Sequence, residues 1–310
     1  MLAVSTHTRS RAALGYIACA LAGGIWGTGF FFGKVAMREM SSAHMVLYRF
    51  LFACIGMAPI LLLRRPGLNL REWRILLMAS FLGVPLQFLL QFAGLARTTV
   101  SHASLMVGTL PVVLAVGASI FSHERLDRIG WAALITSSIG AALIAFGGGA
   151  HSGKADASSL AGDLLVVVSM FIALGWILLN QRLLRNHSPL VVTAYGIATG
   201  TVMLAIWVFS TEGPPPIHIS GTAWLALAAS GLLCTASTTF LWNWGLTQVP
   251  ASRAGVFLNL EPIIGSLLGI AFLSERLGPI AWFGGAMIVG AAFTLTSRPG
   301  SHAEEECLLA

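Results

Sequence analysis

Two ionisable side chains lie inside long apolar runs, where a charge is costly unless it has a function. At 1.5 Å per residue, Glu261 lies roughly 15 Å and Arg49 roughly 9 Å from an end of its run. A carboxylate in such a position can bind and release a proton or pair with a substrate ammonium group. A buried ion pair between Glu261 and Arg49 is the structural alternative, and it does not exclude either role.

Two prolines interrupt apolar runs at matching places. Pro111 and Pro262 each remove a helical N–H, which leaves the carbonyls of Val107 and Leu258 without a helical partner. In an apolar environment, such carbonyls need neighbouring polar groups, water or a ligand. We predict a helix break or gate beside a cavity at both prolines; a kink that only shapes packing is the alternative.

Uncharged polar groups and deep aromatic rings supply the remaining candidates. Amides can hold the carboxylate and ammonium of a zwitterion without adding net charge, and flat rings can line the walls around its side chain. The alternatives are interhelical hydrogen bonds for the polar groups and packing or interfacial anchoring for the rings. The predicted substrate-binding group is Trp26, Phe30, Gln87, Phe88, Gln91, Trp176, Asn180, Thr239, Trp242, Asn243 and Asn259.

Motifs for enzymatic chemistry are missing from the sequence. It has no G-x-S-x-G, no H-E-x-x-H and no complete G-x-x-x-x-G-K-[ST] motif, because the G-x-x-x-x-G-K at 148–154 is followed by Ala155; no His, Cys or carboxylate pair has metal-ligand spacing on one helix. We therefore predict no catalytic residue, no metal and no cofactor, and we do not expect an enzyme. The energy for any transport would come from the substrate gradient or from an ion.

The composition indicates that these residues lie in a lipid bilayer. The 310 residues are 56% hydrophobic and only 10% charged, whereas soluble domains have about 25% charged residues. The basic residues lie scattered at the ends of apolar runs, so we do not expect nucleic-acid binding. Since about 20 apolar residues span a bilayer, we predict ten membrane helices: Leu14–Gly33, Met45–Leu63, Ile75–Ala96, Ser101–Phe121, Ile129–Phe146, Leu160–Leu179, Pro189–Phe209, Ala223–Leu246, Ala251–Leu273 and Ile280–Thr296.

The loop charges predict an orientation. With strict alternation from a cytoplasmic N-terminus, 12 of the 18 Lys and Arg residues fall on the cytoplasmic side and 5 on the outer side, and Arg49 lies within a helix. Cytoplasmic loops are enriched in Lys and Arg. We therefore expect both tails, 1–13 and 298–310, in the cytoplasm.

The two halves of the chain repeat one another. One set of residues recurs 151 positions later without a gap: Pro111, the Glu-Arg-Leu at 124–126 and Trp131. The same offset relates Trp73 to Trp224. Similar offsets relate Trp26 to Trp176, at 150, and Tyr48 to Tyr195, at 147. Five predicted helices per half would insert the second copy upside down, as in many secondary transporters. We predict an all-α membrane protein whose ten transmembrane helices form two inverted five-helix repeats, 14–147 and 160–297.

The same residues resemble the EamA domains of the drug/metabolite transporter superfamily. The resemblance covers 15–297 and rests on Trp26-Gly27 in the first run, Arg49 in the second and the doubled frame of a proline followed by Glu-Arg-Leu. It implies a bacterial inner-membrane exporter of amino acids or related metabolites, with a central cavity lined by helices 1, 3, 4, 6, 8 and 9. Within this superfamily, the sequence resembles the aromatic amino acid exporters in general character, but no substrate motif supports this narrower resemblance.

We therefore expect a secondary active transporter that exports small metabolites, amino acids foremost, by alternating access. The alternative is export of multiple drugs or hydrophobic cations; the small multidrug members of the superfamily use a membrane-embedded Glu in the first helix, and this sequence has none between Gly15 and Val35. A receptor or scaffold would require long loops or a soluble domain, which the sequence lacks. The expected partners are a small-molecule substrate and the bilayer. The oligomeric state is left open, and a monomer is compatible with the sequence.

Overall fold

The regular structure of the described residues is entirely helical. The computed structural model describes residues 2–97, 128–148, 160–273 and 279–296, together with single positions between 103 and 117. In these residues it contains helices and no strand, so the predicted all-helical class is confirmed. The helices long and apolar enough to cross a membrane are Arg11–Ala36, Ser42–Leu63, Leu70–Arg97, Leu164–Leu184, Pro189–Thr211 and Gly221–Gly245, and Gly255–Gly265 and Trp282–Ala291 are shorter apolar stretches.

The first half consists of α1 (Leu2–Ala36), α2 (Ser42–Leu63), α3 (Leu70–Phe81), the π-helical segment η1 (Leu82–Leu86), α4 (Gln87–Arg97) and α7 (Arg128–Gly148). Side-chain caps begin two of these helices. Ser41 accepts a hydrogen bond from the backbone of His44 at the start of α2, and Asn69 and Glu72 form a capping box at the start of α3. Helix α1 starts before the predicted Leu14, because the polar stretch that precedes the apolar run is also helical.

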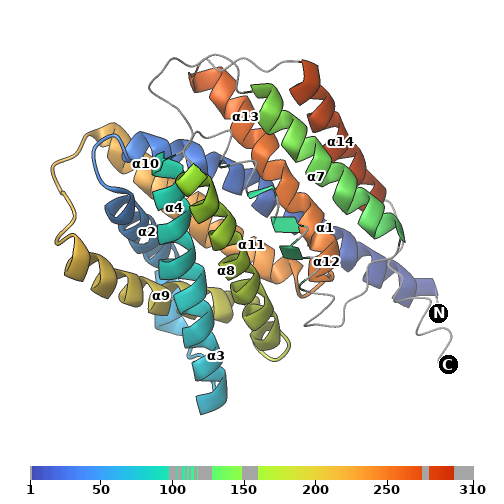
Figure 1. Cartoon of the computed structure of the whole chain (residues 1–310). Coiled ribbons are helices and arrows are strands. Elements are labelled where there is room, and N and C mark those ends of the chain that lie inside the picture. Colours follow the sequence, from blue (N-terminus) through green and yellow to red (C-terminus); the bar gives the residue numbers. More distant parts are fainter. Residues whose placement is uncertain are drawn as a thin grey trace.

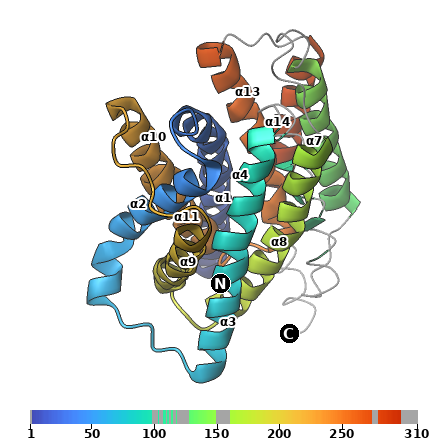
Figure 2. The ribbon, with the colours of Figure 1, turned by 60° about the vertical axis from the view of Figure 1, so that its left-hand side comes forward.

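The second half consists of α8 (Leu160–Leu184), α9 (Pro189–Thr211), α10 (Gly221–Gly231), η2 (Leu232–Ser237), α11 (Thr238–Gly245), α12 (Ala251–Ala254), the 3-10 segment η3 (Gly255–Asn259), α13 (Leu260–Leu273) and α14 (Pro279–Thr296). In both views, α7, α13 and α14 lie side by side along one flank (Figures 1 and 2). Helix α2 packs on α9, and α4 packs on α8.

Two of the predicted helices, Ile75–Ala96 and Ala223–Leu246, correspond to the helical stretches Leu70–Arg97 and Gly221–Gly245, but their hydrogen bonding is not α-helical throughout. Each contains a π-helical segment, η1 beginning at Leu82 and η2 at Leu232. In η2, the hydroxyl of Thr235 donates to the carbonyl of Ser230, and that of Ser237 donates to the carbonyl of Leu232, each five residues back. Apolar periodicity alone does not reveal such an insertion, and π segments are frequent at functional sites.

Glycines bring α1 directly onto the segment that carries Glu261. A methyl group on Gly23 would collide with the backbone of Phe257, and one on Gly27 would lie 2.5 Å from the carbonyl oxygen of Glu261. Only a residue without a Cβ permits this approach of two helix backbones. Helix α1 thus fixes the position of the Glu261 backbone.

Candidate functional site

A cavity lies between helices of the two halves. It has a volume of about 80 Å³ and is lined by residues of α1, α2, α3, η1, α4, α8, α9, α11, η3 and α13, and by Val107 and Leu110. A water molecule needs roughly 10–15 Å³ measured in this way. The cavity therefore has room for several waters or for a small solute.

Most of the predicted substrate-binding residues line this cavity. The lining residues among them are Trp26, Phe30, Gln87, Phe88, Gln91, Trp176, Asn180, Thr239, Trp242 and Asn243. Asn259 is the exception, because it is fully buried away from the cavity and its amide donates to the hydroxyl of Ser137. Pro111 and Pro262 are buried and do not line it either, but Val107 and Leu258, which lie four residues before the prolines, do.

Arg49 is a fixed cation in the cavity wall. Its side chain is 2% exposed; Nε donates to Thr235 Oγ1 over 2.6 Å, and Nη2 donates to the carbonyl of Cys234 over 2.8 Å. The guanidinium carbon also lies 4.9 Å and 5.5 Å from the ring centroids of Phe88 and Phe92. Both hydrogen-bond acceptors belong to η2, so this π segment holds the arginine. A guanidinium carries more donors than these two bonds use, which leaves donors for a ligand.

Glu261 supplies a carboxylate to the same cavity and is 8% exposed. Both charged residues are described, and the contacts of Arg49 are with η2 and the two phenylalanine rings rather than a direct ion pair with Glu261. The two groups are not within ion-pair distance of each other in the described residues, and a pairing between them stays a prediction. The cavity presents a cation and a carboxylate separately.

Three lining side chains also carry buried polar atoms without a protein partner. They are the acceptor Oε1 of Gln87, the donor Nε1 of Trp242 and the acceptor Oδ1 of Asn243. The amide nitrogen of Asn243 donates to Thr193 Oγ1 over 2.9 Å, so its side chain is held in place. Since buried polar groups are nearly always paired, these atoms are the ones that a polar solute would satisfy.

Aromatic rings form much of the remaining wall. The rings of Trp26 and Trp242 lie 5.6 Å apart between centroids, and Phe50 meets Phe88 edge to face at 5.0 Å. The indole of Trp176 packs so closely on η1 that a methyl group on Gly83 would collide with it. The sequence analysis did not identify Phe50 and Gly83 as lining residues. Phe50 directly follows Arg49 in the chain, whereas no neighbouring residue points to Gly83.

Comparison with known proteins agrees with this architecture. The EamA-like transporter family matches residues 13–146 and 160–297. The chain belongs to the EamA-like transporter family. An uncharacterized transporter of Archaeoglobus fulgidus is 24% identical over 282 residues, which cover 88% of this chain and 94% of the relative. The inner membrane protein YtfF of Escherichia coli is 26% identical over 315 residues, which cover 92% and 96%.

A crystal structure that shares 19% sequence identity superimposes with a TM-score of 0.72 over 93% of this chain and 96% of its own, which shows a common fold. The chain is thus a multi-pass membrane protein of the EamA-like transporter family. Relatives that carry a functional name are transporters, not enzymes. The suggested aromatic amino acid branch finds no support in these matches and stays a prediction.

The two charges of this EamA-family transporter break the internal repeat. Tyr48 and Tyr195 are matched at an offset of 147, so the counterpart of Arg49 is Gly196. At the offset of 151 that relates the prolines, the counterpart of Glu261 is Leu110. All four residues line the cavity. Each half therefore contributes one charge of opposite sign to a site that is otherwise built from equivalent segments.

Proposed function

We propose that the protein is a secondary active transporter that exports small zwitterionic metabolites, amino acids foremost, by alternating access through this cavity. The observation that carries the proposal is the separate placement of a cation, Arg49, and a carboxylate, Glu261, in one small cavity. A substrate with a carboxylate and an ammonium group complements both charges and brings no net charge into the membrane.

The roles follow from the hydrogen-bonding capacity of each group. Arg49 keeps free donors beyond those held by η2, so it binds the substrate carboxylate. Glu261 accepts hydrogen bonds from the ammonium group, and its protonation would release that group. The unpaired atoms of Gln87, Trp242 and Asn243 complete the polar shell, and the aromatic wall packs on the substrate side chain.

Export of hydrophobic cations is less compatible with this site. Arg49 repels a second cation, and a solute without a carboxylate leaves the free donors of this guanidinium without an acceptor. The volume of about 80 Å³ also suits a small solute better than a polycyclic drug. Both arguments favour the zwitterion.

Alternating access fits an architecture of ten transmembrane helices in two inverted repeats, with both termini in the cytoplasm of a bacterial cell. The courses of α2 and its counterpart α9 support the inversion. The end of α2 lies beside the start of α9, because the hydroxyl of Tyr195 reaches the carbonyl of Arg64; the start of α2 lies beside the end of α9, because Ser41 contacts Glu212. The two helices therefore run in opposite directions.

Counterflow in proteoliposomes tests the proposal. Vesicles preloaded with unlabelled amino acids should accumulate the radiolabelled form, and Arg49→Gln should abolish this exchange while Val202→Ala, at a position 60% exposed on the outer surface of α9, should not. Amines without the carboxylate and N-acetylated amino acids should both fail to compete. Exchange of cationic dyes but of no amino acid would overturn the proposal and favour the cation exporter.

A further inference from the structure

The bundle has two opposite ends, and each end carries loops from both halves. At the first end α1 passes into α2 and α9 passes into α10; at the second end α2 passes into α3 and α8 passes into α9. Helix α2 separates the ends by about 33 Å, from its 22 residues at 1.5 Å each. The cavity lies between them, so a solute must pass one of these ends to enter or leave.

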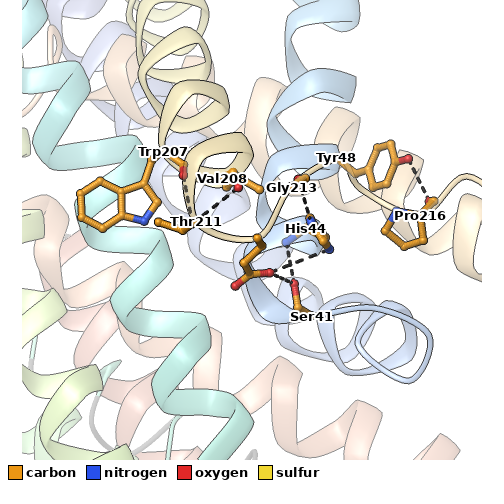
Figure 3. Close-up of polar contacts among 9 residues, drawn as sticks. Ser41, His44, Tyr48, Trp207, Val208, Thr211, Gly213 and Pro216 are labelled. Carbon is orange, nitrogen blue, oxygen red and sulfur yellow. Dashed lines mark hydrogen bonds and ion pairs between the residues drawn. The ribbon is translucent and has the colours of Figure 1, made fainter.

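At the first end a tyrosine of the first half holds a loop of the second half. The hydroxyl of Tyr48 in α2 donates to the carbonyl of Pro216, in the α9–α10 loop, over 3.0 Å (Figure 3). Its ring meets Trp224 of α10 edge to face, with centroids 5.1 Å apart. We call these three residues the first latch.

Further polar contacts between the two halves lie beside the first latch. The hydroxyl of Ser41 donates to the carboxylate of Glu212, and a ring nitrogen of His44 lies 3.9 Å from the same group (Figure 3). Glu39 accepts hydrogen bonds from the hydroxyl and the backbone N–H of Ser220, over 2.6 and 2.8 Å, and these bonds hold the pKa of Glu39 below its ordinary value. Every one of these contacts joins the two halves.

At the second end the same arrangement occurs with the halves exchanged. The hydroxyl of Tyr195 in α9 donates to the carbonyl of Arg64, in the α2–α3 loop, over 2.9 Å. Its ring meets Trp73 of α3 edge to face, with centroids 6.2 Å apart. Nε2 of His187 lies 2.9 Å from the carboxylate of Glu72 beside it. We call Tyr195, Arg64 and Trp73 the second latch.

The two latches are copies of one another. The tyrosines lie 147 positions apart, the tryptophans 151 and the carbonyls that accept the hydrogen bonds 152. Each latch has the same chemistry, a phenol hydroxyl on a loop carbonyl and a ring edge on an indole. Because each tyrosine binds across the halves, neither end can open by a movement of one half against the other unless its latch breaks.

We propose that Tyr48 and Tyr195 are paired gate residues that close opposite ends of the substrate pathway with nearly equal strength. The inference rests on alternating access in the proposed function. Transport in either direction requires that both ends open in turn, which needs latches of similar free energy. Two copies of one interaction make equal contributions at the two ends, to which the further polar contacts beside each latch are added.

The sequence also links the latches to the cavity. Tyr48 directly precedes Arg49, and Tyr195 directly precedes Gly196, and both following residues line the cavity. A solute that pulls on Arg49 therefore acts on the helix turn that carries the first latch. The second latch has no charge beside it, so substrate binding acts unequally on the two ends.

Distances between spin labels test the inference without any substrate. The native cysteines are replaced by serine, and labels are attached at exposed loop positions, as Arg38→Cys with His218→Cys for the first end and Arg65→Cys with Asn186→Cys for the second. Electron paramagnetic resonance in nanodiscs then gives the fraction of molecules in which each pair of loops is separated.

Tyr48→Phe should raise the separated fraction at the first end, and Tyr195→Phe should raise it at the second end. One hydrogen bond contributes about 0.5–1.5 kcal/mol, which corresponds to about a two- to twelvefold change in the open-to-closed ratio. The double variant should restore the balance between the ends. Tyr16→Phe is the matched control, because the ring of Tyr16 packs on Phe257 and takes part in neither latch.

These experiments test the gate proposal independently of the substrate proposal. If both tyrosine variants separate the same end, or if neither differs from Tyr16→Phe, the gate assignment is overturned. A failure of amino acid exchange in vesicles would overturn the substrate proposal and leave these distance shifts intact. Melting temperatures of the three variants show whether all of them are folded.

Discussion

Removing the charge of Arg49 and removing the charge of Glu261 should change the free energy of unfolding by very different amounts. Arg49 makes two hydrogen bonds to η2 and lies over two phenylalanine rings, whereas Glu261 has no direct ion pair with it. We therefore compare Arg49→Gln with Glu261→Gln, since glutamine keeps a similar shape and removes the charge in both cases.

The magnitudes follow from these contacts. Each hydrogen bond from a charged group contributes about 1.5–3 kcal/mol, so Arg49→Gln should cost about 3–6 kcal/mol, less whatever bond the new amide regains. Breaking a direct buried ion pair would cost about 3–5 kcal/mol. Two unit charges at twice the distance of about 4 Å that limits a direct ion pair attract by only about 2 kcal/mol at an effective dielectric constant of about 20. Glu261→Gln also removes the free-energy cost of burying a charged carboxylate. This substitution should therefore lower the free energy of unfolding by less than about 2 kcal/mol.

Thermal unfolding in detergent, with the double variant, separates these cases. For a chain of this size 1 kcal/mol corresponds to a shift in Tm of about 2 °C, so we expect a loss of about 6–12 °C for Arg49→Gln and less than about 4 °C for Glu261→Gln. Amino acid exchange should nevertheless be lost in both. Equal losses of Tm with strong coupling in the double variant would mean that the two residues form a direct ion pair, and the separate roles would be refuted.

Three further predictions concern packing, pH and solvent access. Gly27→Ala places a methyl group 2.5 Å from a backbone oxygen of α13 and should cost about 1–3 kcal/mol in thermal unfolding, whereas Gly24→Ala, whose nearest neighbour would be 3.9 Å away, should be neutral. Because hydrogen bonds lower the pKa of Glu39, its contribution to stability is present above pH 4.5 and is lost as the pH falls through the lowered pKa; melting curves of the wild type and Glu39→Gln should therefore differ at pH 7 and converge in acid. A cysteine at Gln91, in the cavity wall, should react with a hydrophilic thiol reagent and be protected by substrate, whereas one at Asn259 should not react, and equal labelling of both would contradict the cavity boundary.

The sequence predicted the members of the site better than their arrangement. Polar and aromatic residues on the inner faces of apolar runs are rare enough to stand out, which is why Gln87, Gln91 and Trp176 could be found without coordinates. Asn259 is also an amide in an apolar run, but its side chain bonds to Ser137 on α7. The sequence alone does not distinguish an amide that lines a cavity from one that forms an interhelical hydrogen bond. The pairing of Glu261 with Arg49 was equally plausible from depth alone.

The π segments were out of reach for a different physical reason. An extra residue in a helical turn changes hydrogen bonding from four to five residues back without changing hydropathy. Local signals exist in both segments: Pro85 lies inside η1 and lacks an N–H, and in η2 the hydroxyls of Thr235 and Ser237 bond to carbonyls five residues back. Without η2 there is no acceptor pair for Arg49, so the placement of the cation could not be predicted either.

Duplication accounts for which features stayed alike and which diverged. Movement between two open states requires equivalent closures at the two ends, and the tyrosine, tryptophan and loop carbonyl of each latch occur in both copies. Recognition of one asymmetric solute requires the opposite, since a zwitterion has a different charge at each end. Arg49 accordingly faces the cavity from one copy, where the other has Gly196, and Glu261 faces it where the first copy has Leu110. In the proposed mechanism, a symmetric frame around an asymmetric site would let the same bound solute be presented to either end while its orientation between the two charges stays fixed.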